Sequence, residues 1–497
     1  MQRCYIPQVR SSCVLVAASL VTAAFFGGCS SSKDQPVVEY PEAGSAGDVP
    51  GVDAAVASDA GADAAADAPA PVNAKQLLTG SVFIEGVTSD GSLVFDDGKN
   101  VNVLPAGATT PVLVVADYDP GTDSLLVRGR FVAAWLGNTT SALPLVLWAK
   151  TGGVQTIAPL TYRDSFYPRN AADDFAYTTA GGSLLRRNVW ATKAGQGAGT
   201  KVVAELDTGL TNAPCRPTIT WTATSLLVAG CANGVTTAKV DVYALDGTGP
   251  TRTVLDGSAP GIWPDHARTH ALVQTSTASS VRALSGAASV VPLDGPVKQA
   301  AFSSDDTKVV FLHGDGKVKR AATTAPAAPV ELLGAAISLL AISSDARFTV
   351  VATKGDPTNF NSDLIVCDAT TPATPRTIAA EKAAFIGVSR SGTHAIWLAD
   401  RGIGLEGALY TALLPNGAPQ KLSMLAERVT LDGDVVYWQE FDPASKSNVL
   451  KAAQVATGAV TQISQGLDAL TAQTVVVGKS LFVASKLGLW EYPALTQ

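Results

Sequence analysis

One short pattern recurs along most of this chain: a polar turn followed at once by a run of β-forming residues. Ten such turns occur, with a mean spacing of about 43 residues. They are marked by Asp90, Asp123, Asp174, Ala223, Asp265, Asp306, Asp345, Gly392, Gly433 and Gly478. A period of this length predicts an array of one repeated β unit, because such a unit buries its apolar faces only against its neighbours.

A second pattern follows many of these turns: an apolar strand, a turn rich in Gly, Pro or Asn, and a strand ending in a branched aliphatic residue. It is clearest at 241–255, 363–378, 408–422 and 448–463. Apolar residues alternate along these strands, as expected for half-buried strands, and the turn residues suit hairpins. The two patterns together predict four short antiparallel strands in each unit. The low charged fraction of 16%, with 45 Gly and 28 Pro, also favours short strands and turns over amphipathic helices.

Units of four antiparallel strands at this period are typical of the blades of a β-propeller. We therefore predict an all-β fold, a single β-propeller domain over residues 77–497 with about 7–10 four-stranded blades. The last unit stops one strand short of a blade, and the strand LLTGSVFIE (77–85) near the start is unused. That N-terminal strand is expected to join the last blade and close the ring. An irregular β-sandwich, or two separate β domains, is the alternative.

Two segments carry a resemblance to a known family. AFSSDDTKVVFLHGDGKVKRA (301–321) and the segment 363–378 resemble the TolB-like, WD-repeat-like propeller repeat of bacterial envelope proteins. The similarity is strongest from 296 to 463, although Ser304 stands where the family has a proline, and the units before residue 213 are degenerate. TolB-like proteins engage other envelope proteins, so the resemblance implies an envelope protein as partner. Repeats of this type imply a fold much more strongly than a function.

The first 29 residues have the layout of a bacterial export signal. Two arginines and no acid precede a largely apolar run over residues 13–26, which is too short to span a bilayer permanently. The Gly-Gly-Cys ending resembles the lipobox of bacterial lipoproteins, which implies that residues 1–28 are removed and that Cys29 is acylated. Ser30 implies a location at the outer membrane, on its periplasmic or its surface face. An ordinary signal peptide with an incidental cysteine is the alternative.

Between this cysteine and the repeats lies a segment poor in core-forming residues, which we interpret as a disordered linker over residues 29–76. Ala, Asp, Gly and Pro dominate it, and Tyr40 is its only aromatic residue. Such a composition cannot bury enough apolar surface to offset the entropy of ordering it. Coil statistics give a root-mean-square reach of about 35–40 Å. A helix over the Ala-rich part is the alternative, which Gly61 and the unpaired Asp residues disfavour.

Most of the net charge of −7 lies outside the repeats. Residues 30–75 carry eight acids against two lysines, so the repeats themselves are close to neutral. A near-neutral array offers no basic stripe that could neutralise phosphates. Nucleic acid is therefore not an expected partner.

Three cysteines fall within the repeats. Cys215 and Cys231 flank a predicted hairpin turn centred on Ala223, and antiparallel pairing about that turn would set them opposite each other. An oxidising periplasm permits a disulfide between them. Two reduced, packed thiols are the alternative. Cys367 lies on an apolar strand and is predicted to be a small buried hydrophobe.

No constellation of residues predicts a catalytic site, a metal site or a cofactor. His266 and His270, beside Asp265, have the spacing of zinc ligands on one helical face, but they fall on a predicted turn and strand. The Asp-rich turn at 117–124 resembles a calcium loop, yet it lacks the Gly and Glu that an EF-hand requires. Turn formation explains it without an ion.

These features predict an envelope lipoprotein whose propeller is a non-catalytic protein-binding or scaffolding module. Its membrane contact is the lipid anchor, and its loops on one face would form the binding surface. The alternative is a propeller enzyme of the hydrolase or lactonase type, with several acids or histidines converging at the central channel. Acids do occur at equivalent turns, at Asp90, Asp306, Asp345 and Asp432, but turn formation already accounts for them.

Overall fold

The computed structural model describes residues 74–494, apart from 138–142, 170–171, 184, 209–216, 232–236, 258, 260, 325–326, 355–361, 400–405, 445–446, 468–472 and 486. The regular elements of this part of the chain are all β-strands, and they form five four-stranded sheets, one seven-stranded sheet and one ten-stranded sheet. Within the described residues, no helix is long and apolar enough to cross a membrane. Cys29 and nearly all of the predicted linker lie outside the described residues.

The two large sheets contain more than one blade, because single long strands run from one blade into the next. β9 (Gly153–Pro168) pairs with β8 (Leu143–Ala149) through its first half and with β10 (Asp174–Ala180) through its second half. In the ten-stranded sheet, β28 (Arg376–Val388) and β31 (Gln420–Asp432) do the same. Each of these strands is the outer strand of one blade and the inner strand of the next. The described residues therefore form ten four-stranded blades.

The blades are numbered along the chain. Blades 1 to 5 are formed by β2 (Phe83–Val87), β3 (Leu93–Asp96), β4 (Val101–Leu104) and β5 (Val112–Val115); by β6 (Ser124–Arg128), β7 (Phe131–Trp135), β8 and the start of β9; by the end of β9, β10, β11 (Arg186–Lys193) and β12 (Thr200–Asp207); by β13 (Thr218–Trp221), β14 (Leu226–Gly230), β15 (Lys239–Tyr243) and β16 (Pro250–Asp256); and by β17 (Gly261–Pro264), β18 (His270–Gln274), β19 (Ser279–Ala283) and β20 (Val290–Leu293).

Blades 6 to 10 continue in the same order. They are formed by β21 (Val297–Phe302), β22 (Lys308–His313), β23 (Val318–Ala322) and β24 (Val330–Leu333); by β25 (Ser338–Ile342), β26 (Phe348–Ala352), β27 (Ser362–Asp368) and the start of β28; by the end of β28, β29 (His394–Ala399), β30 (Gly407–Leu413) and the start of β31; by the end of β31, β32 (Val435–Asp442), β33 (Ser447–Gln454) and β34 (Val460–Leu467); and by β35 (Gln473–Val477), β36 (Ser480–Ser485), β37 (Gly488–Pro493) and β1 (Lys75–Thr79).

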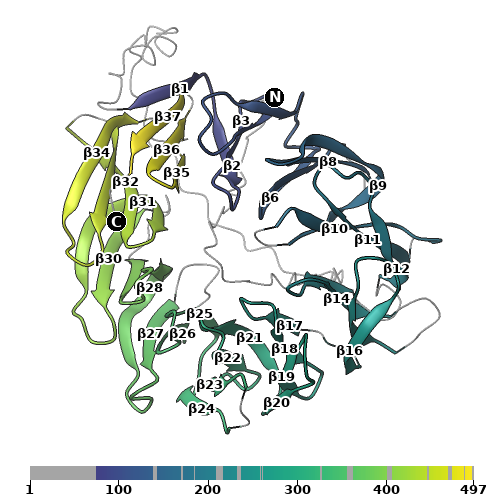
Figure 1. Cartoon of the computed structure of the whole chain (residues 1–497). Coiled ribbons are helices and arrows are strands. Elements are labelled where there is room, and N and C mark those ends of the chain that lie inside the picture. The colour runs from purple at the N-terminus through teal and green to yellow at the C-terminus, as the bar shows by residue number, and fades with distance from the viewer. Residues whose placement is uncertain are drawn as a thin grey trace, which may run out of the picture. The chain divides into compact units, whose positions relative to one another are not determined.

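The blades follow one another in a closed ring. The first strands of neighbouring blades contact one another at most steps, from β2 and β6 to β31 and β35, and β35 in turn contacts β2. In Figure 1 the chain runs by colour from purple β2 through teal and green to yellow β37, which lies beside β1. The predicted all-β propeller is confirmed, and the blade number is at the upper end of the predicted range.

The predicted turn marks fall at the connection between the first and second strand of a blade, with one exception. Asp123 lies before β6, which is the first strand of blade 2. The corresponding connection in blade 2 consists of Gly129 and Arg130 alone, between β6 and β7. The sequence prediction placed the mark of this unit one connection earlier, because the Asp-containing turn before β6 is also followed by an apolar run.

Neighbouring blades pack face to face, so that the middle strands are buried on both sides. Every residue of β7 and of β26 is buried, whereas the outer strand β20 alternates between exposed and buried residues. Burial on both faces is the reason that the second strands read as continuous apolar runs. Between blades 2 and 3, the ring centroids of Phe131, Phe166 and Phe175 lie 5.3 to 5.5 Å apart. Each pair of neighbouring blades encloses such an apolar cluster.

The N-terminal strand closes the ring, as predicted. β1 is the outer strand of blade 10 and pairs antiparallel with β37, with Thr79 opposite Gly488. The predicted strand 77–85 is nevertheless two strands. It divides at Gly80, whose φ of 91° suits a glycine, and the second part begins blade 1 as β2.

Candidate functional site

The connection between the first and second strand of a blade, here called the first turn, repeats one arrangement in blades 1, 5, 6, 7 and 8. A residue with an oxygen-bearing side chain begins the turn, and its carbonyl accepts a hydrogen bond from the N–H of the residue three positions later. That later residue has a positive φ, which glycine adopts with the least steric cost. The residues at this position are Gly91, Arg268, Asp306, Ala346 and Gly392.

Blade 7 shows how the side chains complete the turn. The hydroxyl of Ser343 donates to Asp345 at 2.6 Å and accepts from the N–H of Phe348 at 2.9 Å. The carboxylate of Asp345 also accepts from the N–H of Arg347 at 2.9 Å. The polar groups of this turn therefore satisfy one another.

Of the four acids predicted at equivalent turns, the structure confirms the positions of two and corrects those of the other two. Asp90 and Asp345 do occupy equivalent positions, but the equivalent residue in blade 6 is Asp305, not Asp306. Asp432 is the last residue of β31 rather than part of the turn. The prediction that turn formation accounts for the acids is confirmed for Asp90 and Asp345, whose carboxylates accept hydrogen bonds within their own turns.

Hydrogen bonds also link the first turns of neighbouring blades. Ser89 of blade 1 donates its N–H to the carbonyl of Gly129 in blade 2 at 2.6 Å. The carboxylate of Asp306 accepts the N–H groups of His266 and Ala267 in blade 5, both at 2.8 Å. Further links run from Arg130 to Asp173, Arg169 to Ala223, Ala223 to Arg268, Ser304 to Ser344, and Arg390 to Gly433. These bonds join the first turns of blades 1 to 7 in one series and those of blades 8 and 9 in another. We call the first turns of blades 1 to 9 the first-turn belt.

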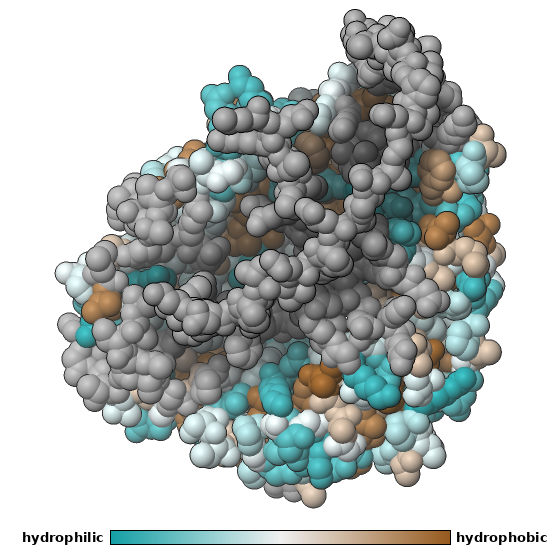
Figure 2. Space-filling view, turned by 180° about the vertical axis from the view of Figure 1, so that it is seen from behind, coloured by the Kyte–Doolittle hydropathy of each residue, from teal (hydrophilic) through white to brown (hydrophobic). Residues whose placement is uncertain are grey.

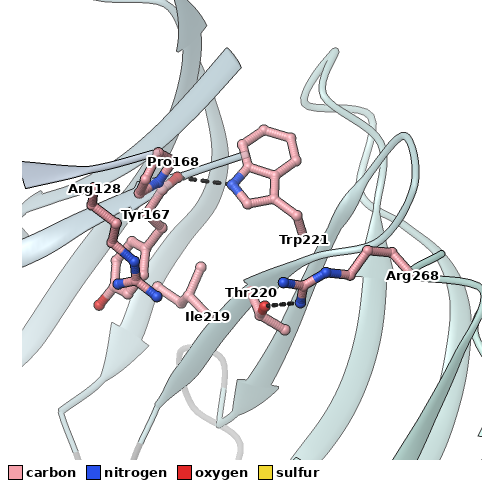
Figure 3. Close-up of a pocket in the computed structure, with 7 residues that line it drawn as sticks. All are labelled: Arg128, Tyr167, Pro168, Ile219, Thr220, Trp221 and Arg268. Carbon is pink, nitrogen blue, oxygen red and sulfur yellow. Dashed lines mark hydrogen bonds between the residues drawn. The ribbon is translucent and has the colours of Figure 1, made fainter. Parts of the chain in front are cut away.

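A small pocket of about 30 Å³ lies at one part of this belt. It is lined by Arg128 at the end of β6, Tyr167 and Pro168 at the end of β9, Ile219, Thr220 and Trp221 in β13, and Arg268 in the first turn of blade 5 (Figure 3). The indole N–H of Trp221 donates to the carbonyl of Tyr167 at 2.8 Å, and the guanidinium of Arg268 donates to the hydroxyl of Thr220 at 3.3 Å. These bonds tie the walls of the pocket together.

Two guanidinium groups face this pocket, and no acidic residue lines it. They approach it from opposite sides in Figure 3. Arg128 is exposed, and its guanidinium makes no hydrogen bond or ion pair with the described part of the chain. Burial lowers the pKa of Arg268; the charge of Asp265 opposes that effect, and the nearby charge of Arg128 lowers the pKa further. Arginine stays protonated in proteins, so the pocket carries two positive charges.

Two other arginines near the pocket have carboxylate partners. Arg130 lies 3.5 Å from Asp173, and Arg169 lies 2.9 Å from Asp174. These acids are thus engaged with residues outside the pocket lining. The two charges that line the pocket are not balanced by them.

The residues weighed for metal binding are engaged in other contacts. Nδ1 of His266 lies 2.8 Å from Asp306 of the next blade, and Nδ1 of His270 lies 3.4 Å from Asp265. In the turn at 117–124, carboxylates accept backbone N–H groups, as expected for turn formation. Among the described residues, no group of three or more His, Cys, Asp or Glu side chains could hold a metal ion.

The cysteine predictions have different outcomes. Cys215 lies outside the described residues, so the Cys215–Cys231 disulfide stays a prediction; Cys231 is fully buried and packs with Ala238. Cys367 lies on β27 as a free, fully buried thiol, and burial raises its pKa to about 12. The predicted packed thiol at Cys367 is confirmed.

Sequence analysis identified neither Arg128 nor Arg268 as a site residue. Arg268 does leave a signal in the sequence: it stands at the turn position that is Gly91 in blade 1 and Gly392 in blade 8. Aligning the first turns with one another would have shown a bulky cation where glycine is preferred. Nothing local distinguishes Arg128 from other surface arginines.

Exposed apolar residues do not distinguish one face among the described residues. The large apolar side chains that are more than half exposed are Leu113, Val290, Leu413, Met424 and Leu425. They lie on blades 1, 5 and 8 and on the strand between blades 8 and 9. Seen from behind, the described surface mixes hydrophilic and hydrophobic residues (Figure 2). The two positive charges that line the pocket, those of Arg128 and Arg268, are therefore a more distinctive feature than the exposed apolar residues.

No protein-family model matches the chain, and no curated protein matches it. Solved structures similar to it include a eukaryotic initiation factor, with 14% identity and a TM-score of 0.49 over 70% of this chain and 89% of that one. They also include the C-terminal WD40 domain of Sif2, with 13% identity and a TM-score of 0.39 over 65% and 95%. A candidate TolB from Agrobacterium tumefaciens has 11% identity and a TM-score of 0.26 over 48% and 92%. The neighbours thus include WD40 and TolB-like propellers, and at these scores no inference about ligand or activity follows from them.

Proposed function

We propose that the chain is a bacterial envelope lipoprotein whose propeller binds a partner protein through the first-turn belt, without catalysing a reaction. The Gly-Gly-Cys ending at Cys29 supports the lipid anchor. Two or three acyl chains hold a protein stably at a membrane, where one chain is marginal. The composition of residues 30–76 supports a flexible tether, which would let the propeller work about 35–40 Å from the outer membrane.

The first-turn belt is the observation that best supports a binding role. Its turns belong to a rigid ring of blades and are linked to one another, so little conformational entropy is lost when a partner docks on them. Rigid β frames commonly display recognition residues on such connections. The carboxylates that an enzyme could use are committed to structure: Asp90 and Asp345 to their own turns, and Asp306 to the turn of blade 5.

Acylation at Cys29 is tested by mass spectrometry of the N-terminal peptide of the membrane-extracted protein. We expect a diacylglycerol-modified cysteine at the new N-terminus, and loss of membrane association in the Cys29→Ser variant. An unmodified Cys29, or a Cys29→Ser protein that stays in the outer-membrane fraction, would refute the anchor.

Partner binding is tested by site-specific photocrosslinking in the native host. A photoreactive residue at Ser344 lies on the belt, where the side chain is exposed. The matched control is Lys99, which is also exposed but lies between the second and third strands of blade 1, at the opposite end of the strands. We expect Ser344 to yield one or two discrete crosslinked envelope proteins and Lys99 to yield none. Equal products from both positions, or none from Ser344, would count against the proposal.

A further inference from the structure

The backbone of Arg268 shows that its side chain occupies a costly position. It has a φ of 59°, in the left-handed region where glycine is favoured. The equivalent residues Gly91 and Gly392 avoid this cost, and Asp306 compensates for it with hydrogen bonds to the neighbouring blade. Ala346 has a φ of 53° at the same position, but its side chain is a single methyl group. The Arg268 guanidinium makes only one hydrogen bond with the described residues, to Thr220. Strained positions of this kind cluster at functional sites.

The two arginines that line the pocket retain unused hydrogen-bond donors. Arg128 has no partner among the described residues, and Arg268 uses one donor. The acids nearest to Arg268 are engaged already: Asp265 accepts the N–H groups of Thr269 and His270, and Asp306 accepts two N–H groups of its neighbouring turn. Two cations brought together without a carboxylate in the lining favour an anionic ligand.

The geometry points to a carboxylate-binding site between Arg128 and Arg268, which takes an acidic side chain or the C-terminal carboxylate of the bound partner. Guanidinium groups are planar forks that bind carboxylates through paired N–H donors. The assignment of the carboxylate to a partner protein rests on the proposed function. The anion chemistry of the pocket does not.

The lining of the pocket favours an anion that is carried on an apolar stem. The guanidinium groups of Arg128 and Arg268 supply the positive charge, and no acidic residue lines the pocket. The apolar surfaces of Ile219, Pro168 and Trp221 then suit the methylene groups that carry an Asp or Glu carboxylate.

The position of the pocket favours a carboxylate carried by a protein. Its lining residues lie at the ends of first strands and in a first turn, next to the belt, and Arg128 is exposed there. A macromolecule docked on the first-turn belt can insert one carboxylate into the pocket. A free small acid would gain little, because one of its two guanidinium partners, Arg128, is exposed and exposed ion pairs are weak.

The test uses the purified full chain and an array of capped peptides, each with one central Glu or Asp between neutral residues. Matched peptides carry Gln or Asn instead, and a third set has a free C-terminal carboxylate as its only acid. Succinate and inorganic phosphate serve as small-molecule probes. The variants are Arg128→Gln and Arg268→Lys, which keeps the charge but loses the planar fork. The control is Lys99→Gln, at an exposed cation outside the pocket and at the opposite end of the strands from the belt.

We expect the best acidic peptides to bind at least tenfold more tightly than their amide copies. Arg128→Gln and Arg268→Lys should each lose most of that difference, and Lys99→Gln should stay within twofold of the wild type. The inference is overturned if amide copies bind equally, if Lys99→Gln loses as much as Arg128→Gln, or if only succinate or phosphate binds. The set that binds best tells a side-chain carboxylate from a C-terminal one.

Photocrosslinking from Ser344 in the Arg128→Gln background separates this inference from the proposed function. If the wild type crosslinks a partner and Arg128→Gln crosslinks it equally well, the proposed function stands and the carboxylate site is wrong. If no partner is crosslinked but acidic peptides bind in an Arg128-dependent way, the site stands and the proposed function fails. The guanidinium of Arg128 has no partner in the described fold, so its substitution is expected to leave folding intact.

Discussion

The first turns of blades 6 and 7 differ from those of blades 2 to 5 in how they satisfy their polar groups. In blades 6 and 7, a serine hydroxyl and a carboxylate saturate one another and the turn amides, as Ser343 and Asp345 show. In blades 2, 3 and 5, arginines reach beyond their own turns, as Arg169 does to the carbonyl of Ala223. The first turns of blades 6 and 7, whose side chains bond within the turn, leave few hydrogen-bond donors for a ligand. In blades 2 and 5, the guanidinium groups of Arg128 and Arg268 line one pocket.

This difference indicates where a repeat protein can carry function. Local rules hold where a turn has only to connect two strands, and they fail where a side chain is kept for another purpose. Arg268 is the one long side chain among the five equivalent residues with positive φ, which are otherwise Gly91, Asp306, Ala346 and Gly392. Blades 6 to 9, where the sequence repeat is clearest, are here called the regular blades, and blades 2 to 5 the irregular ones. We infer that the irregular blades carry the function.

The largest expected effect tests whether the cores of the regular and irregular blades also differ in packing. Trp438 and Trp135 are both fully buried, one in blade 9 and one in blade 2, and each indole donates one hydrogen bond. Replacing either with Ala should lower the free energy of unfolding by about 3–5 kcal/mol. Chemical denaturation followed by circular dichroism measures it. Leu413→Ala, at a side chain that is 51% exposed, is the control and should stay within about 0.5 kcal/mol.

Equal losses for the two tryptophans would confine the difference between the blades to their turns. If Trp135→Ala costs less than half as much as Trp438→Ala, the irregular blades are also loosely packed. The difference between the two sets of blades would then extend from their turns to their cores.

The second effect concerns the closing blade, which joins the end of the regular blades to blade 1. A Cβ on Gly488 would lie 2.1 Å from the carbonyl oxygen of Leu78 in β1, at a φ of 146°. Gly478, at a φ of 60°, has nothing within 4 Å of such a Cβ. We expect Gly488→Ala to cost about 2–3 kcal/mol and to speed hydrogen exchange in β1 and β37, whereas Gly478→Ala should cost about 1 kcal/mol.

Faster exchange throughout blades 2 to 5 in Gly488→Ala would mean that the irregular blades depend on ring closure more than the regular ones. Exchange limited to β1 and β37 would mean that the irregular blades are held by their own contacts. Similar losses of stability in the two glycine variants would show that β1 does not lie in close contact with Gly488.

The repeat fold could be predicted from the sequence because its main determinants are local. Buried second strands read as apolar runs, and the missing strand of the last blade was visible as an unused segment at the start. The exact turns were harder, because the turn before β6 looks like a first turn in the sequence. The sequence also does not distinguish Asp305, which bonds within its own turn, from Asp306, which has a positive φ and reaches blade 5. The pocket could not be predicted, since Arg128 and Arg268 come from blades 2 and 5 and meet only in the closed ring.

A smaller effect tests directly the first turns whose side chains bond within the turn. Ser343 is buried, and its hydroxyl bonds both Asp345 and the N–H of Phe348. Ser343→Ala should lower the free energy of unfolding by about 1–2 kcal/mol, because it leaves the amide of Phe348 without this acceptor. Ser344→Ala, at the exposed neighbouring serine, is the matched control and should have almost no effect. Equal losses for the two serines would show that the hydroxyl does not hold the turn.

The smallest expected effect is a pH dependence of the stability, which arises from Asp305 in the first turn of blade 6. Hydrogen bonds from the hydroxyl of Ser303, and then from the N–H and hydroxyl of Thr307, lower the pKa of Asp305 to about 2 from an ordinary value of 3.8. The folded state therefore binds this proton less readily than the unfolded chain does. Its stabilising contribution is fully present above pH 3.8 and is lost as the pH falls towards 2.

The difference in melting temperature between the wild type and Asp305→Asn should accordingly be constant near pH 5 and shrink between pH 4 and pH 2, as measured by differential scanning fluorimetry. Ser304→Ala, at the exposed uncharged neighbour, should show no such dependence. A difference that stays constant down to pH 2 would mean that the carboxylate of Asp305 does not form these bonds. The regular turns would then owe their shape to the backbone alone, and the contrast with the arginines of blades 2, 3 and 5 would lose its electrostatic basis.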